Sequence, residues 1–285
     1  MMERVGRLMD IRSISCVYFS PTGSTARIVE SIARGMNGEN VRSIDLTLRS
    51  RRGEHSLAFN KEIVILGTPV YYGRVPEEAA SCFSAMSGQQ TPVVLVVTYG
   101  NRAFDDALLE LRDMAVGRNF VPIAAAAFTA EHSYSSDKHP IAPGRPDERD
   151  IERTLEFGAA VRAKLLGVKS VGEAGALSVP GQFPYKVPEN LLLIKNLRAT
   201  TPFSFTPETD MAECTGCGLC PQVCPTGAVS ADDLTKTDKF GCIICFACIK
   251  KCPAGARRMK MEQFHARIQE LSKLCRERKE PSVFL

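Results

Sequence analysis

Eight of the eleven cysteines lie between positions 214 and 252, in two copies of one pattern. Each copy reads C-x2-C-x2-C-x3-C-P, and the second copy follows the first at a constant offset of 28 residues, as from 214 to 242. The repeat continues past the prolines, because Gly227-Ala228 recurs as Gly255-Ala256. Four thiols so closely spaced bring the chain tightly around a common centre, and this constrains the C-terminal part of the molecule more than any other feature.

The spacing is that of chain segments that hold iron–sulfur clusters. Three cysteines at i, i+3 and i+6 surround three irons of a cubane, and the fourth, which precedes a proline, ligates the cluster of the other copy. The pattern therefore predicts two [4Fe–4S] clusters. One would be held by Cys214, Cys217, Cys220 and Cys252, and the other by Cys242, Cys245, Cys248 and Cys224.

Closely spaced cysteines have two other common uses. Paired C-x2-C knuckles also bind structural zinc, but zinc sites usually separate two knuckles by a long spacer. A disulfide framework would need an export signal, and residues 1–15 alternate charged and apolar residues without the apolar core of a signal peptide. The cysteine usage thus favours clusters and predicts a reducing cytoplasm as the location.

The remaining composition is that of an ordinary globular chain of two domains, with 285 residues, 44% hydrophobic and 24% charged. The net charge of +4 gives no argument for nucleic acid. The longest apolar runs, 92–97 and 121–128, are typical of buried strands and are too short for a membrane span.

Residues 1–168 alternate short apolar runs with helical patterns, which predicts an α/β domain with a parallel sheet covered on both faces. The expected strands are 14–19, 41–46, 62–67, 93–98 and 120–128, and the expected helices are 25–35, 76–86, 104–116 and 147–166. Five strands interleaved in this way fit the doubly wound order 2-1-3-4-5, in which ligands bind at the carboxyl ends of the strands.

The loop 20–25 joins the first strand to the first helix and reads S-P-T-G-S-T. Hydroxyls and N–H groups at a helix N-terminus form a phosphate site. No lysine follows the glycine, so the loop is not the P-loop of an ATPase or GTPase, and it suits a single terminal phosphate. The alternative is that these residues only cap the helix.

Two further loops, 68–76 and 98–102, follow the third and fourth strands. Tyr71, Tyr72 and Tyr99 offer aromatic faces for stacking, although loop tyrosines are often only surface residues. Gly73 and Gly100 would let the backbone approach a flat ligand closely.

This domain resembles the flavodoxin family, whose phosphate loop reads S/T-x-T-G-x-T. Pro21 occupies the variable position and removes one N–H donor. The resemblance implies FMN as the cofactor. The residues expected to bind it are Ser20, Thr22, Gly23, Ser24, Thr25, Pro69, Val70, Tyr71, Tyr72, Gly73, Thr98, Tyr99, Gly100 and Asn101.

One departure from flavodoxins concerns charge, because Arg74 and Arg102 stand in the two loops expected around the flavin ring. Positive charge there would favour the anionic reduced flavin. His132, between Glu131 and Ser133 after the fifth strand, is a weaker candidate for a flavin contact, since a histidine on a loop is more often simply solvated. Cys16 and Cys82 are interpreted as small buried apolar residues.

Residues 169–207 are expected to form a connector that packs on the first domain, with a helix at 190–197 and cover for Phe183, Tyr185, Phe203 and Phe205. Residues 208–260 are predicted to be a small α+β two-cluster ferredoxin domain that folds largely through cluster binding. Its apolar residues would line the clusters: Leu219, Val223, Ile243, Ile244, Phe246 and Ile249. Residues 261–285 are predicted to be a basic amphipathic helix, either structural or able to dock an acidic partner, and Cys275 is given no role.

A flavodoxin-like domain followed by a two-cluster ferredoxin resembles the flavodoxin–ferredoxin fusion proteins of anaerobic bacteria and archaea. The resemblance implies a cytoplasmic electron-transfer flavoprotein that interconverts one- and two-electron carriers. Its partners would be redox proteins of the ferredoxin-type donor or acceptor class, and a homodimer is left open. The alternative is an FMN-dependent reductase of a small molecule, fed with electrons through the clusters. The chain carries no convergent acid–base pair and no nicotinamide motif, which favours the carrier.

Overall fold

A computed structural model describes residues 13–52, 57–186, 189, 192, 206–260 and 262–285. The main sheet has six strands in the order β2-β1-β3-β4-β5-β8, and its first five strands are parallel. The strands are β1 (Ser13–Tyr18), β2 (Asn40–Asp45), β3 (Ile63–Pro69), β4 (Thr91–Tyr99), β5 (Phe120–Thr129) and β8 (Ser282–Phe284). The predicted α/β fold with the order 2-1-3-4-5 is therefore confirmed.

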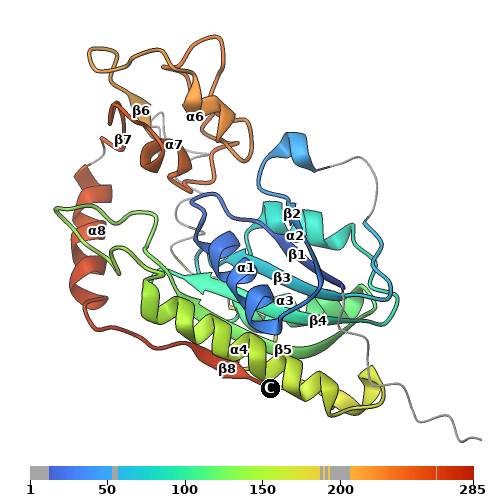
Figure 1. The fold of residues 1–285 in the computed structure, drawn as a ribbon. Coiled ribbons are helices and arrows are strands. Elements are labelled where there is room, and N and C mark those ends of the chain that lie inside the picture. Colours follow the sequence, from blue (N-terminus) through green and yellow to red (C-terminus); the bar gives the residue numbers. More distant parts are fainter. Residues whose placement is uncertain (1–12, 53–56, 187–188, 190–191, 193–205, 261) are drawn as a thin grey trace, which may run out of the picture.

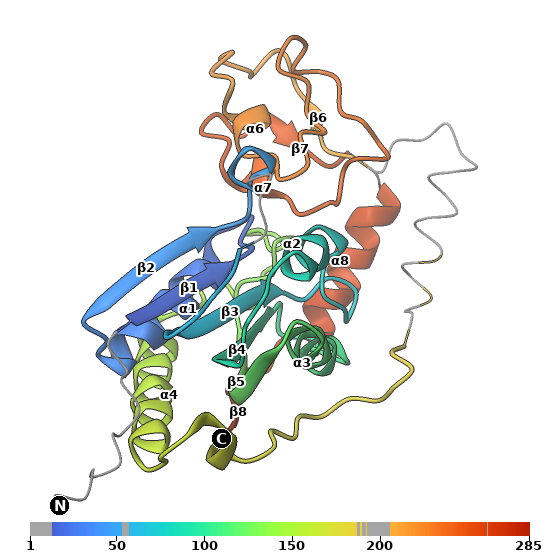
Figure 2. The same ribbon diagram turned by 90° about the vertical axis from the view of Figure 1, so that its right-hand side faces the viewer.

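Helices cover both faces of the sheet (Figures 1 and 2). One face is packed by α1 (Ser24–Met36) and α4 (Glu148–Leu166), and the other by α2 (Glu77–Ser84) and α3 (Ala107–Gly117). All residues of β4 are buried, because this central strand is covered from both sides. For the same reason, the apolar run that predicted this strand does not alternate apolar with polar residues.

Two glycines let α1 and α4 touch through their backbones. A Cβ atom on Gly158 would lie 2.3 Å from the carbonyl oxygen of Ile32, and one on Gly35 would lie 2.3 Å from that of Leu155. Larger residues would push the helices apart. The first helix is thereby fixed with its N-terminus at the carboxyl edge of the sheet.

A few described residues of the connector contact the first domain, and most of the others are exposed. The connector begins with the short helix η2 (Val171–Ala174), and Val179 belongs to the core cluster that also contains buried residues of α2 and α3. The hydroxyl of Tyr185 donates to Asp113 at 2.7 Å. Phe183, for which cover was expected, is 78% exposed. The expected helix 190–197, Phe203 and Phe205 lie outside the described residues.

The cysteine-rich region, residues 208–260, lies beyond the carboxyl ends of the parallel strands (Figure 1). Its elements are β6 (Glu208–Thr209), α6 (Leu219–Gln222), α7 (Ala247–Lys250) and β7 (Arg257–Arg258). β6 and β7 pair antiparallel and bring the two ends of the region together. Direct contacts hold the region to the first domain, including an ion pair of 2.6 Å between Lys250 and Glu131 and a hydrogen bond of 3.0 Å from Arg52 to the carbonyl of Pro225. A further short helix, η1 (Arg49–Arg51), precedes Arg52.

The chain then returns to the first domain, which the sequence did not predict. The expected helix over 261–285 is shorter: α8 spans Glu262–Leu274, and the last residues form β8, which pairs antiparallel with β5. Ile268 of α8 and Cys275 pack against Ile141. A strand of three residues behind a run of charged residues has too little pattern to be recognised.

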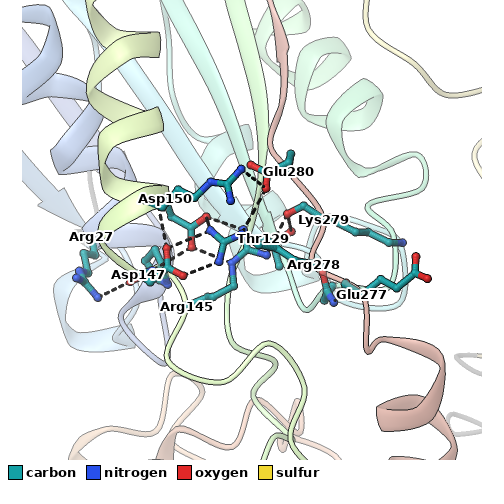
Figure 3. A network of polar contacts seen from close by, with 12 residues as sticks. Arg27, Thr129, Arg145, Asp147, Asp150, Glu277, Arg278, Lys279 and Glu280 are labelled. Atoms are coloured by element: carbon teal, nitrogen blue, oxygen red, sulfur yellow. Dashed lines mark hydrogen bonds and ion pairs between the residues drawn. The ribbon is translucent and has the colours of Figure 1, made fainter.

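A buried ion network holds this returning segment (Figure 3). Arg145 donates to both carboxylate oxygens of Asp150, at 2.8 and 2.5 Å, and to the carbonyl of Lys279 at 3.0 Å. Arg278 bonds Asp150 at 3.0 Å and Asp147 at 2.6 Å. Asp147 and Asp150 also form the capping box of α4, so one helix start anchors the C-terminal tail.

Breaking this network is expected to be costly. The side chains of Arg145 and Asp150 are 5% and 1% exposed, so Arg145→Met removes a buried partner and should lower the free energy of unfolding by ~3 kcal/mol. The matched control is Arg153→Met on α4, the helix that carries Asp150. The pair of Arg153 with Glu156 is more than half exposed, so this change should alter stability by less than ~1 kcal/mol. Denaturant unfolding of the full chain measures both, and equal losses would contradict the role given to Arg145.

Candidate functional site

A cavity of about 840 Å³ lies at the carboxyl edge of the sheet and is called the edge cavity. Loops after β1, β3, β4 and β5 form one side, and the cysteine-rich region and α8 form the other. The predicted cofactor residues that line it are Ser20, Thr22, Ser24, Thr25, Pro69, Val70, Tyr71, Tyr72, Gly73, Thr98, Tyr99 and Gly100. Gly23 and Asn101 are not part of the lining.

The loop 20–25 turns sharply into α1. Gly23 occupies the N-cap position with a φ of 94°, and α1 carries no side-chain cap and no acidic residue in its first turn. The Ser20 hydroxyl accepts from the N–H of Ala26 at 3.0 Å, and the hydroxyls of Thr25 and Thr98 lie 2.6 Å apart. Thr22 and Ser24 also line the cavity, beside the first-turn N–H groups, which have no acceptor within the helix.

The loop after β3 forms a two-residue hairpin turn. Tyr71 and Arg74 exchange both backbone hydrogen bonds at 3.0 Å, and Tyr72 and Gly73 both have positive φ. The turn holds Tyr71 and Tyr72 in the wall of the cavity. Burial raises the pKa of Tyr71 well above its ordinary value, so this phenol stays protonated.

The loop after β4 serves packing more than was predicted. A Cβ atom on Gly100 would lie 2.1 Å from Cδ2 of His132, so glycine is required here by the histidine ring. Tyr99 is buried in the core and packs edge-on against Phe104 at 5.6 Å. Asn101 donates to the carbonyls of Cys275 and Glu277, both at 2.8 Å, and so binds the C-terminal tail instead of facing the cavity.

The two arginines expected near the flavin ring behave differently. Arg74 is not among the lining residues, because it forms two hydrogen bonds with Glu110, at 2.8 and 2.7 Å. Its guanidinium also lies over the ring of Tyr185 at 4.9 Å. Arg102 lines the cavity together with its ion-pair partner Asp105. The expectation for Arg74 is therefore corrected, and the charge of Arg102 is partly balanced.

His132 lines the cavity and is held by its neighbours. Its Nδ1 accepts from the N–H of Tyr134 at 3.1 Å, and its ring lies 4.7 Å from that of Tyr134. Burial, reinforced by Arg102 and Lys250, lowers its pKa from 6.5 to about 4. The imidazole is therefore neutral at neutral pH, with the Nδ1 position free of a proton.

The cysteines gather around two smaller cavities. The first thiol cavity is lined by Cys214, Cys217, Cys220 and Cys252, and the second thiol cavity by Cys224, Cys242, Cys245 and Cys248. Each set takes three cysteines from one copy of the motif and the fourth from the other. Cys217 is exposed, whereas Cys245 and Cys248 are buried, so the first cavity lies nearer to solvent.

The edge cavity and the second thiol cavity share a wall. Ile243 and Ile244, between the first two cysteines of the second copy, line both. Ile244 and Phe246 have φ of 54° and 61°, where the first copy has Gly216 and Gly218. Left-handed backbone is costly for bulky residues, so packing must hold it.

That packing comes from an aromatic cluster between the cysteine-rich region and the first domain. Phe246 lies 4.6 Å from Tyr134 and 5.4 Å from Phe264 of α8, measured between ring centroids. Phe264, Ile268 and Leu271 of α8 also line the edge cavity. Their helical spacing was visible in the sequence, but nothing in it showed which surface the helix covers.

Among residues 13–285, excluding those left undescribed, no three His, Cys, Asp or Glu side chains stand close enough to hold a single metal ion. In the same part of the chain, no helix is both long and apolar enough to cross a membrane.

Comparison with known proteins supports the assignment of the C-terminal part. The model of the 4Fe-4S binding domain family matches residues 207–230, which contain the first cysteine motif. A search of curated proteins returns no match.

Solved structures similar to the first domain include two flavodoxins and an oxidoreductase. A flavodoxin from the domain Archaea matches 54% of this chain and 98% of its own, with 14% identity and a TM-score of 0.35. Oxidised flavodoxin 2 from Bacillus cereus matches 53% and 99%, with 17% identity and a TM-score of 0.38. Rubredoxin oxygen:oxidoreductase from the anaerobe Desulfovibrio gigas matches 57% and 38%, with 15% identity and a TM-score of 0.40.

The first domain has the flavodoxin-like strand order in its own right, and the region that follows matches a 4Fe-4S binding domain. The chain thus has the domain arrangement of a flavodoxin–ferredoxin fusion.

The state of His132 makes the stability of the protein depend on pH. Because its pKa is lower in the folded chain, protonation favours unfolding, and stability is lost as pH falls from 6.5 towards 4. Between pH 7 and pH 5 the loss should be about 2 kcal/mol.

Urea unfolding of wild-type protein and His132→Gln at both pH values measures this loss by difference, since other titrating groups are common to the two proteins. The variant should lose less stability over this interval by about that amount. Parallel pH curves would show that His132 is not held neutral.

Proposed function

We propose that the protein is an electron carrier that binds FMN in the edge cavity and one [4Fe–4S] cluster in each thiol cavity. FMN exchanges one or two electrons and each cluster exchanges one, so together they connect one- and two-electron carriers. The observation that carries the proposal is the wall formed by Ile243 and Ile244, which line both the edge cavity and the second thiol cavity. Among the described residues, these two side chains would then be the only protein layer between the flavin and the second cluster.

The residues of the edge cavity fit an FMN molecule. Its volume of about 840 Å³ lies within the range of cavities that bind cofactors. At one end, the uncapped N-terminus of α1 with Thr22 and Ser24 would hold the phosphate. At the other end, Tyr71, Tyr72 and the neutral His132 would border the ring.

The thiol cavities fit clusters because each is lined by four cysteines. The exchange of the fourth cysteine joins the two copies of the motif, so that loss of one cluster would disturb the other. Apolar side chains close the second cavity, and burial raises the pKa of the Cys245 thiol, which a positively charged metal centre would reverse.

The unequal exposure of the two thiol cavities suggests the order of the sites along the electron path. The first thiol cavity, with the exposed Cys217, would exchange electrons with a partner protein. The second thiol cavity, with the buried Cys245 and Cys248, would exchange them with the edge cavity. Because α8 covers the edge cavity, a protein partner would reach the flavin through the clusters.

Anaerobic purification with chemical analysis tests the cofactor set. We expect about eight irons and eight acid-labile sulfides per chain, together with one FMN. Cys245→Ala should lose at least half of the iron, because it removes a ligand of the second cluster.

Cys82→Ala is the matched control, since Cys82 lies on α2 and lines neither thiol cavity, and it should keep the full content. Zinc in place of iron, without acid-labile sulfide, would contradict the proposal. Protein that contains the clusters but no flavin would support only a ferredoxin function.

A further inference from the structure

Arg257 is a buried cation between the two thiol cavities. It lies in β7, is 2% exposed, and is the only charged side chain in the described part of the chain that lines both cavities. Its neighbour Arg258 points to the surface and pairs there with Glu213. The strand thus turns one arginine inward and the next outward.

Neutral groups and one thiol surround the Arg257 guanidinium. Nη1 donates to Thr209 Oγ1 at 2.8 Å and to the carbonyl of Leu234 at 3.3 Å. Nη2 donates to Thr237 Oγ1 at 2.9 Å and lies 3.9 Å from the Sγ atom of Cys248. Nε is buried without a hydrogen-bond partner.

Among the described residues, no carboxylate forms an ion pair with Arg257, so none of them supplies a counter-ion for its charge. An unpaired charge in the interior costs several kcal/mol. A buried arginine is therefore expected only where a bound group supplies negative charge next to it. Four thiolates on each side, around a cluster of net negative charge, would supply it.

The internal repeat shows which other residue occurs at the position of Arg257. Gly255-Ala256-Arg257 corresponds to Gly227-Ala228-Val229 in the first copy. Val229 is also buried and lines the second thiol cavity. The loop geometry therefore accepts an apolar residue at this position, and the arginine is not needed to build the turn.

We infer that Arg257 is the internal counter-charge of both clusters and raises their reduction potentials. This rests on the proposed function, since it needs clusters in the thiol cavities. Reduction adds one electron, and so one negative charge, to a cluster, and a fixed cation nearby in a medium of low polarity favours the more negative state.

The cluster of the second thiol cavity should be affected more, because Cys248 receives the hydrogen bond from Nη2. Arg257 also lines the first thiol cavity together with Cys220. It is a positioning and tuning residue, and it makes the buried cluster next to the edge cavity easier to reduce.

Potentiometric titration of the intact protein, followed by EPR, tests the inference. Arg257→Met keeps the length of the side chain and removes its charge. We expect at least a tenfold decrease in the equilibrium constant for cluster reduction, which is ~59 mV towards more negative potential. Arg257→Lys keeps the charge and should stay within threefold of wild type. Arg258→Met, the matched control, should leave the potentials unchanged.

Equal potentials in Arg257→Met and Arg258→Met, both with full iron and sulfide, would overturn the inference while leaving the proposed function intact. If Arg257→Met assembles no clusters, the Arg257→Lys variant decides between charge and packing. Clusters with near wild-type potentials in Arg257→Lys support the role of the charge. If Arg257→Lys also assembles no clusters, Arg257 is needed for packing and the inference is overturned. A wild-type protein without iron would instead refute the proposed function.

Discussion

The attachment of the cysteine-rich region at both of its ends is the constraint on which the rest of the structure depends. Before the region, described residues of the connector bond to Asp106 and Asp113 at α3, and after it α8 leads to β8, which pairs with the edge strand β5 (Figure 2). Two anchors fix the return, the ion network around Asp150 and the bonds from Asn101 to the tail. A domain on a single tether would sample many positions. Held twice, the region stays over the carboxyl edge.

The cysteine-rich region therefore lies next to the carboxyl edge of the sheet. In a doubly wound fold, loops at this edge bind the ligand. Here the second copy of the cysteine motif lines the same cavity as these loops, through Ile243 and Ile244. Its bulky Ile244 and Phe246 replace glycines of the first copy, and the backbone strain of these positions is balanced by packing against Tyr134 and α8. The two copies have therefore diverged, one towards solvent and one towards the cavity.

The sequence predicted the parts that depend on local pattern. The strand order followed from five apolar runs alternating with helices, and the grouping of cysteines was expected from their spacing alone. It did not predict what depends on contacts between distant segments. The pairing of Arg74 with Glu110, the hold of Asn101 on the tail, and the course of the last residues as β8 are all of this kind. The burial of Arg257 could not be predicted, because an arginine in a basic segment carries no sign of burial.

The central claim is that electrons pass within one chain between the edge cavity and the second thiol cavity. Flash photoreduction of the flavin in the intact protein, with cluster absorbance followed over time, tests it most directly. The account predicts bleaching of the clusters in a first-order process whose rate constant does not change on dilution. A rate proportional to protein concentration, or a reduced flavin beside clusters that stay oxidised although their potential permits reduction, would contradict it.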